Sequence, residues 1–344
     1  MNPIFLTKAI SDQQRFNNRF YLWSLIPSNS VVVTEHIIYQ VDRLPAISKY
    51  ISNSDNQTIY LDFSQNPEIL ESQHALGMFD QLRQFAPLKI LVNEYKKFYT
   101  PDKNFIYYPA FFHAYSHETY LEPISVINFP KFEKKTKSFM SLNNRAVWHR
   151  IWLFTELASN NLLDKIDYSF VWDPKIDQHN QLDQLPEHKY NQALTLLDQL
   201  PIRVPDEQNG NFISNAVVLG PKCYNECAVN IVTESCPNLG FLTEKICKPL
   251  ACYQIPILLS HTGATQFCQD AGFDMFEDII PWRTWDSIAD DQERYTVACR
   301  FIVDYIKHGD ALADWHRCQD RVIANRERLV SDDFKKFCTA QFVT

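Results

Sequence analysis

Four polar residues stand close together in the second half of the chain, at Glu234, Thr243, Glu244 and Lys245. Glu234 follows an apolar run at 229–232 that has the composition of a short β-strand, and the other three stand at the expected start of a helix. The positive dipole end and unpaired N–H groups of a helix N-terminus suit a diphosphate, and Lys245 would add a full charge. Glu244 can accept both hydroxyls of a ribose. This spacing indicates a nucleotide-sugar site.

The elements around these residues follow from the apolar pattern. A helix is predicted to begin near Phe241, and a buried strand follows at 255–259. Ligands of open α/β sheets bind at the carboxyl ends of the strands, which is where Glu234 should lie. The alternative interpretation is a solvated ion pair of Glu244 and Lys245 on the helix surface. The second carboxylate and the intervening loop of breakers favour a site.

A second group of polar residues lies upstream, at Arg145, His149 and Arg150. The pattern again predicts a strand (139–142), a polar turn and a helix (147–157). Two guanidinium groups with a histidine are suited to the oxygens of a diphosphate, because the planar fork of arginine matches them. Both arginines are candidates for this contact. A surface ion pair is the alternative for Arg150.

The segment around Glu234 resembles the donor-binding signature of the α-1,3-fucosyltransferases, glycosyltransferase family 10. Asn230-Ile-Val-Thr-Glu234, Phe241-Leu-Thr-Glu-Lys245 and Ile255-Pro-Ile-Leu258 carry the resemblance. Phe241 stands where the family has tyrosine, and Thr233-Glu234-Ser235 stands where it has Phe-Glu-Asn. The resemblance implies transfer of a sugar from a nucleotide-diphosphate sugar, a GDP-sugar included, and a diphosphate contact for Arg150.

The predicted fold class is α/β, with two Rossmann-like doubly wound domains facing a cleft, the GT-B architecture. The length of 344 residues favours two domains, and β-like runs alternate with room for helices in both halves. We expect an acceptor-side domain at 1–132, a donor-binding domain at 133–325 and a tail at 326–344. Strands are predicted at 31–34, 59–63, 90–93 and 105–108. Helices are predicted at 68–85 and 186–200, and one long C-terminal helical segment is predicted from 290 to 328.

The aromatic stretch 107–115 is open to two interpretations, as a surface on which sugar rings stack or as core packing plus a loop. The basic run 131–137 is predicted to be a solvated linker, with contact to a membrane surface as the alternative. Both interpretations concern the region where the two domains should join.

The chain holds no Asp-x-Asp motif, so we expect metal-independent, inverting transfer without a cofactor, in which positive side chains stabilise the leaving diphosphate. A base must then take the proton of the acceptor hydroxyl. Glu94 is the first candidate because it follows a predicted strand. Glu35, Asp62 and His113 are its competitors.

Composition limits the remaining classes of function. A net charge of −8 disfavours a nucleic-acid groove. The chain shows neither a membrane span nor a signal-peptide core, so we expect a cytoplasmic protein, with peripheral membrane contact left open. Nine cysteines without a Cys-x-x-Cys motif favour reduced thiols over disulfides or zinc. The acceptor would be a glycan or lipid-linked glycan. The alternatives are a nucleotide-sugar epimerase or hydrolase, and a non-catalytic sugar-binding protein.

Overall fold

A computed structural model of the chain describes residues 4–6, 30–34, 58–63, 83, 87–92, 105–107, 109–117, 129–171, 181–202, 204, 219, 222–235 and 240–340. The chain divides into two compact units. The first comprises residues 1–127, 239–241 and 331–344, and the second comprises 128–238 and 242–330. Both are α/β units built on a parallel sheet, as predicted.

The first unit contains a five-stranded sheet in the order β1-β2-β3-β4-β5, with all neighbours parallel. Its strands are β1 (Ile4–Leu6), β2 (Val31–Thr34), β3 (Ile59–Phe63), β4 (Leu88–Val92) and β5 (Phe105–Tyr107). Four of these match predicted strands to within two residues, because each is a run of apolar and β-branched residues. The short strand β1 was not predicted. The predicted helix at 68–85 falls almost wholly outside the described residues.

The aromatic stretch after β5 forms helix α6 (Ala110–Ser116), and every residue of this helix is buried. Phe112 packs edge-to-face on Phe334 of helix α17 (Asp332–Thr339), with ring centroids 5.7 Å apart. The expectation of a loop at 110–115 was therefore wrong. The interpretation as core packing was right for this stretch, since aromatic side chains bury large apolar areas when they pack together.

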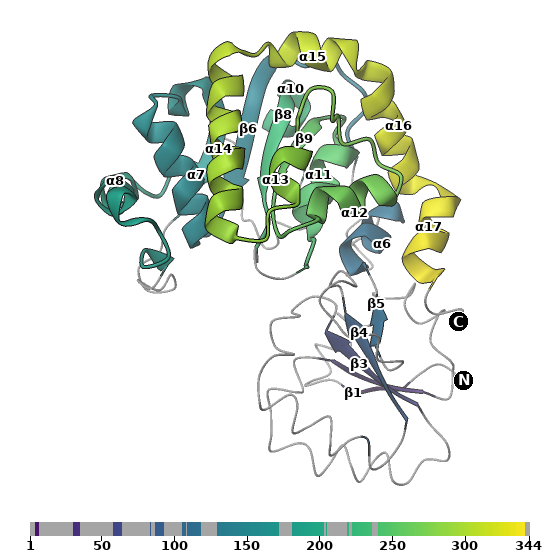
Figure 1. Ribbon diagram of the computed structural model, residues 1–344. Coiled ribbons are helices and arrows are strands. Elements are labelled where there is room, and N and C mark those ends of the chain that lie inside the picture. Colours follow the sequence, from purple (N-terminus) through teal and green to yellow (C-terminus); the bar gives the residue numbers. More distant parts are fainter. Residues whose placement is uncertain are drawn as a thin grey trace. The chain divides into compact units, whose positions relative to one another are not determined.

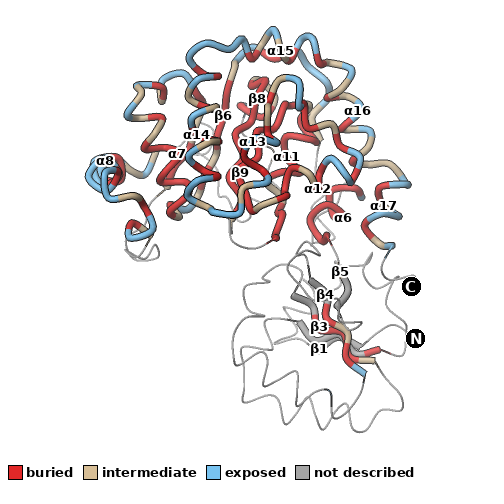
Figure 2. Tube along the Cα trace, in the orientation of Figure 1, coloured by how far each residue is buried: buried red, intermediate tan, exposed pale blue. Residues whose placement is uncertain are grey.

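The second unit contains a four-stranded parallel sheet in the order β7-β6-β8-β9, of which Figure 1 labels β6, β8 and β9. Its strands are β6 (Lys137–Asn143), β7 (Ile166–Phe170), β8 (Cys227–Thr233) and β9 (Ile255–Leu259). Every residue of β8 and β9 is buried (Figure 2). Parallel strands with both faces covered are typically apolar throughout, which explains why the sequence pattern predicted these strands well.

Helices cover this sheet. Helix α7 (Trp148–Ser159) packs against α8 (Glu187–Leu197) and α14 (Asp291–His308), and α11 (Glu244–Ala251) packs on β8, β9 and α16 (Gln319–Val330). The remaining described helices are η3 (Leu163–Lys165), α10 (Cys223–Glu226), α12 (Ala264–Asp270), α13 (Arg283–Asp286) and α15 (Ala311–Arg317).

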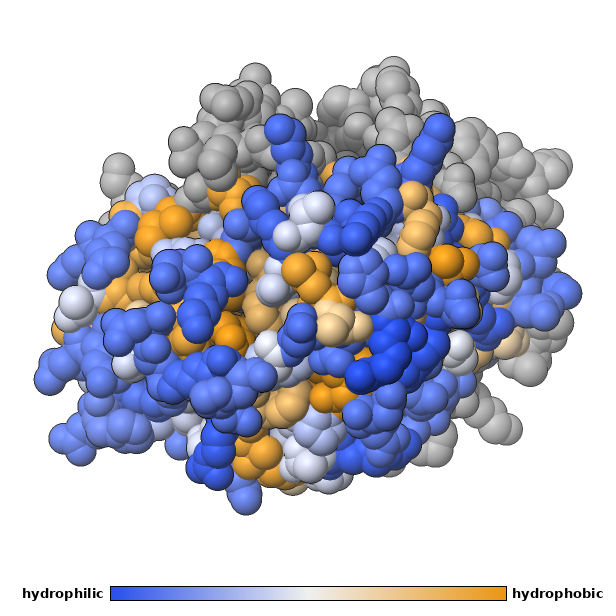
Figure 3. Space-filling view, turned by 90° about the horizontal axis from the view of Figure 1, so that it is seen from above, coloured by the Kyte–Doolittle hydropathy of each residue, from blue (hydrophilic) through white to orange (hydrophobic). Residues whose placement is uncertain are grey.

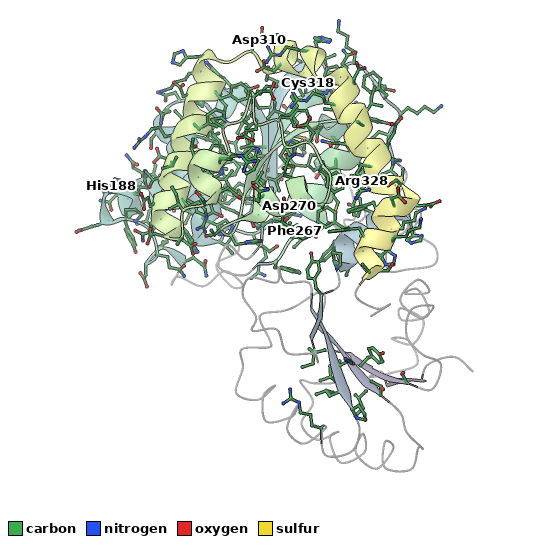
Figure 4. The ribbon with its side chains drawn as sticks, turned by 45° about the vertical axis from the view of Figure 1, so that its right-hand side comes forward. His188, Phe267, Asp270, Asp310, Cys318 and Arg328 are labelled. Atoms are coloured by element: carbon green, nitrogen blue, oxygen red, sulfur yellow. The ribbon has the colours of Figure 1, made fainter. Side chains whose placement is uncertain are left out.

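Two predicted helix boundaries were wrong. Helix α11 begins at Glu244 rather than near Phe241, because the Thr243 side chain accepts the Lys245 N–H and acts as the N-cap. The C-terminal segment forms α14, α15 and α16 instead of one helix. Gly309 separates α14 from α15, and a Cβ at this position would lie 2.2 Å from Cδ2 of Tyr305. Asp310 then caps α15 (Figure 4).

The basic run 131–137 is only partly solvated. Lys131 and Lys134 are exposed, but Lys135 is buried and donates to the carbonyl oxygens of Tyr224, Asn225 and Cys252 at 3.0, 2.9 and 2.8 Å. The prediction of a solvated linker therefore fails at Lys135, which joins segments about a hundred residues apart in the sequence.

The face seen from above in Figure 3 is mostly hydrophilic, with hydrophobic residues scattered among polar ones. Within the described residues, no helix is both long enough and apolar enough to cross a membrane. The cysteines in this part of the chain are buried, and none of them is joined to another in a disulfide.

Candidate functional site

The sheet of the second unit has a topological switch point between β6 and β8. From β6 the chain moves to β7 on one side, and then returns to β8 and β9 on the other side. In open α/β sheets the crevice at the carboxyl ends of the two strands flanking such a point is where ligands bind. The segments that follow β6 and β8 are the two in which the sequence placed its candidate residues.

The junction after β8 is held together by Glu234. Its carboxylate accepts the backbone N–H of Thr243 at 3.1 Å and the Thr243 hydroxyl at 2.6 Å. The Thr243 oxygen in turn accepts the Lys245 N–H at 3.3 Å. Glu234 is fully buried, and burial raises its pKa, although Lys245 and the Thr243 hydrogen bonds oppose that shift. Glu234 therefore fixes the start of α11 to the end of β8.

Lys245 and Glu244 lie nearer the surface of the same junction. The ammonium group of Lys245 contacts the hydroxyls of Ser235 and Thr243 at 2.9 and 3.2 Å and the Glu244 carboxylate at 3.1 Å, and its side chain is 24% exposed. Burial alone would raise the pKa of Glu244, but Lys245 and Lys248 lower it to about 2. Glu244 is therefore an ionised acceptor beside a partly accessible cation.

Arg150 and His149 come from the first turn of α7 and reach the end of β8. Arg150 donates to the backbone oxygens of Thr233 and Glu234, both at 3.3 Å, and to that of Arg145 at 3.1 Å. The Nε2 atom of His149 lies 2.7 Å from the Glu234 carbonyl oxygen and must carry a proton, because a carbonyl only accepts. Both side chains are buried. They connect the two junctions at the switch point.

The surroundings of His149 keep it neutral. Burial and the neighbouring charge of Arg150 lower the pKa of His149 well below its ordinary value. Trp148 and Tyr295 pack against its ring, with centroids 5.5 Å from it in each case. In the described residues, the Nδ1 atom of His149 and the hydroxyl of Tyr295 have no hydrogen-bond partner. His149 thus serves as a neutral donor to the strand end.

The other predicted site residues lie in different environments. Arg145 lies exposed in the loop after β6, where it is close in sequence to the buried Arg150. Phe241 is buried in the first unit, edge-to-face with Phe111 at 6.0 Å. His113 is buried on α6. Glu94 and Glu35 lie outside the described residues, as does the Asp62 side chain.

The helix starts at this edge are already capped by the protein. Thr243 and Lys245 N–H groups are occupied at α11, and the Trp148 N–H of α7 donates to the Gln181 side chain at 3.0 Å. The expectation of unpaired N–H groups at α11 was therefore wrong for these two positions. A capped helix end still carries its dipole, and the partly exposed Lys245 and the exposed Arg145 add full positive charges at this edge.

Sequence reasoning missed three residues at this edge. Ser235 contacts Lys245, the carboxamide oxygen of Asn143 accepts from the Thr233 hydroxyl at 2.5 Å, and Tyr295 packs on His149. Asn143 directly follows a predicted strand and Ser235 stands three positions after another, which was a usable signal. Tyr295 lies more than a hundred residues from His149, and no local pattern indicates their contact.

Comparison with known proteins gives a limited result. No protein-family model and no curated protein matches the chain. Among solved structures, the chain is similar to an α1,3-fucosyltransferase, with 11% identity, 97% of this chain and 91% of the other covered, and a TM-score of 0.42. It is also similar to OtsA in its apo form, with 14% identity, 98% of this chain and 78% of the other covered, and a TM-score of 0.44. A trehalose-6-phosphate synthase is similar with 12% identity, 98% of this chain and 80% of the other covered, and a TM-score of 0.44. These scores and identities are too low to show a family.

Proposed function

We propose that the chain is a glycosyltransferase of the GT-B type that binds a nucleotide-diphosphate sugar at the switch point of its second unit. The observation that carries this proposal is the position of the site. Arg150, His149, Glu234, Glu244 and Lys245 meet at the carboxyl ends of the two strands where the sheet reverses its order. That edge is the ligand-binding edge of open α/β sheets.

The geometry supports a division of roles among the charged residues. Lys245, which is partly exposed, and the exposed Arg145 would contact the diphosphate, since both are cations at the surface of the junctions. Glu244 is ionised and acceptor-only, so it would accept ribose hydroxyls. Arg150, His149 and Glu234 are buried and would hold the two junctions in register.

The transfer itself is proposed to be inverting and metal-independent. Cations at the donor site would stabilise the charge that develops on the departing diphosphate. A carboxylate of the first unit, with Glu94 as first candidate, would remove the proton of the acceptor hydroxyl as it attacks the anomeric carbon. The acceptor would be a glycan or lipid-linked glycan, and the enzyme would work in the cytoplasm or at the membrane surface. The sugar and a GDP donor follow only from the resemblance to family 10.

A thermal-shift screen with nucleoside diphosphates and their sugars tests the donor site. A ligand that binds only the native state raises the melting temperature by mass action. We expect one nucleotide class to shift the parent and to shift Lys245→Ala and Glu244→Ala much less. Lys134→Ala is the matched control, because Lys134 is an exposed lysine of the same unit. The proposal fails if no nucleotide shifts the parent, or if all three variants respond equally.

Product analysis then separates the classes of activity. A glycosylated acceptor identifies a transferase, whereas free sugar or an epimer without glycosylated acceptor identifies a hydrolase or epimerase. Binding without turnover identifies a sugar-binding protein. Undiminished turnover by Glu94→Gln would remove Glu94 from the mechanism.

A further inference from the structure

Two histidines at the C-terminal end of α6, one in the helix and one at its C-cap, converge at one point. Their Nε2 atoms, in His113 and His117, lie 3.1 Å apart. Residues four apart lie on the same face of a helix, so both rings project from one side of α6. His113 is buried, and its ring packs edge-to-face on that of the exposed His117, with centroids 4.8 Å apart. The pair is therefore reached from solvent on the side of His117.

The separation of the two nitrogens fits a metal ion as well as a direct N–H···N hydrogen bond. With metal–nitrogen bonds of about 2.1 Å, nitrogens at this separation subtend an angle of about 95° at the metal. That angle is close to the right angle of square-planar or octahedral centres and narrower than the tetrahedral angle of structural zinc sites. Imidazole nitrogen is a preferred ligand of Ni²⁺ and Cu²⁺.

We propose that His113 and His117 form a two-nitrogen site for a divalent transition-metal ion of the Ni²⁺ or Cu²⁺ type, with water in the remaining positions. No group of three or more ligating side chains occurs in the described part of the chain, so the proposed site has two ligands among the described residues. The site lies wholly in the first unit and is independent of the donor site.

The charges facing the pair come from α17. Burial, His117 and Lys335 lower the pKa of His113 to about 3, and burial and Lys335 lower that of His117, against the opposing charge of Asp332. Lys335 pairs with Asp332 at 3.0 Å. Lys335 repels an added cation, while the Asp332 carboxylate attracts it and can hydrogen-bond its water ligands.

Calorimetric titration of the untagged chain with NiCl₂ tests this site. We expect one equivalent of Ni²⁺ to bind and to raise the melting temperature. The main variant is His117→Gln, because an exposed position tolerates it and a carboxamide can still hydrogen-bond to His113 while it ligates metals poorly. Binding should weaken at least tenfold in His117→Gln and stay unchanged in His188→Gln, a matched change at an exposed histidine of α8 (Figure 4).

A second variant keeps the proposal falsifiable if His117→Gln is misfolded. Lys335→Gln removes the repelling cation and frees Asp332, so Ni²⁺ should bind several-fold more tightly. Equal Ni²⁺ binding by the parent and a folded His117→Gln protein would overturn the site, as would an absence of binding by the parent. Unchanged affinity in Lys335→Gln would count against it in the same way.

Discussion

At the scale of single residues, the two arginines near β6 have different environments. Arg150 is 3% exposed and donates to strand-end carbonyls, whereas Arg145 is exposed in the loop before it. Five positions separate them in the sequence. The sequence ranked Arg150 first for the diphosphate, and burial shifts our proposal for the phosphate contact to Arg145.

Arg145→Ala should therefore lower nucleotide affinity, whereas Arg150→Met should lower stability. We expect Arg145→Ala to keep its stability and lose at least about tenfold in nucleotide affinity, the loss of one charged contact. Arg150→Met should lose about 1–3 kcal/mol of unfolding free energy, because it leaves the buried carbonyl oxygens of Thr233 and Glu234 without this donor. Denaturant unfolding measures the stability of both variants, and nucleotide titration measures their affinity. If Arg150→Met loses nucleotide affinity while Arg145→Ala keeps it, Arg150 is the phosphate ligand.

Glu244 should contribute to the loss of folding stability at acid pH. Its pKa in the folded chain is about 2, below the ordinary value of 4.5, because Lys245 and Lys248 outweigh burial. A lowered pKa gives stability that is present above about pH 4.5 and is lost as the pH falls toward 2. Glu244→Gln should flatten this part of the stability curve, measured by urea unfolding between pH 7 and pH 3. Glu187→Gln, at an exposed position of α8, should leave the curve unchanged.

At the scale of elements, Thr243 makes one hydrogen bond more than a helix N-cap needs. Its oxygen accepts the Lys245 N–H and its hydroxyl donates to the buried Glu234. One side chain therefore caps α11 and also holds its start to the end of β8, through two hydrogen bonds. The Thr-Glu-Lys triplet seen in the sequence occupies the N-cap and first two positions of α11.

Thr243→Ala should destabilise the second unit by about 2–3 kcal/mol, since it removes a cap and leaves Glu234 short of a partner. Asp290 caps α14 at an exposed site, where it accepts the Glu293 N–H at 2.8 Å. Asp290→Ala should cost only about 1 kcal/mol, and Thr243→Ser should restore most of the loss. Equal losses in the two alanine variants, measured by denaturant unfolding, would argue against the special role of Thr243.

Lys135, in the segment before β6, donates hydrogen bonds to carbonyl oxygens of α10 and of the C-cap of α11. Burial lowers its pKa to about 8, from 10.5 in an unfolded chain. Between these values the unfolded state binds more protons, so the contribution of Lys135 to stability increases as the pH rises from about 8 to about 10.5. Lys135→Met should lack this increase relative to the parent. Lys134→Met, at the exposed neighbour, should retain it when both are unfolded at pH 8 and pH 10.

At the scale of the whole molecule, the two proposed ligands belong to different units. The nucleotide site lies at the switch point of the second unit, and the histidine pair lies on α6 of the first. Each ligand should therefore stabilise its own unit. The two sites can be tested separately in one chain.

Hydrogen exchange with and without each ligand measures this separation. A nucleoside diphosphate should slow exchange in residues 143–151 and 233–248, and Ni²⁺ should slow it in α6 and α17. Protection by the nucleotide that is confined to α6 and α17 would contradict the assignment of the donor site to the second unit.

The sequence by itself determined the local elements of this protein. The strands β8 and β9 were predictable because parallel strands buried on both faces are apolar without interruption, and Thr243, Glu244 and Lys245 marked a helix start because capping depends on neighbouring residues. Only the tertiary structure decided that Arg150 and Lys135 are buried, that Arg145 stays exposed, and that β6 and β8 lie side by side. Burial and strand order depend on contacts between residues about a hundred positions apart, such as Lys135 with Cys252, and no local pattern encodes those contacts.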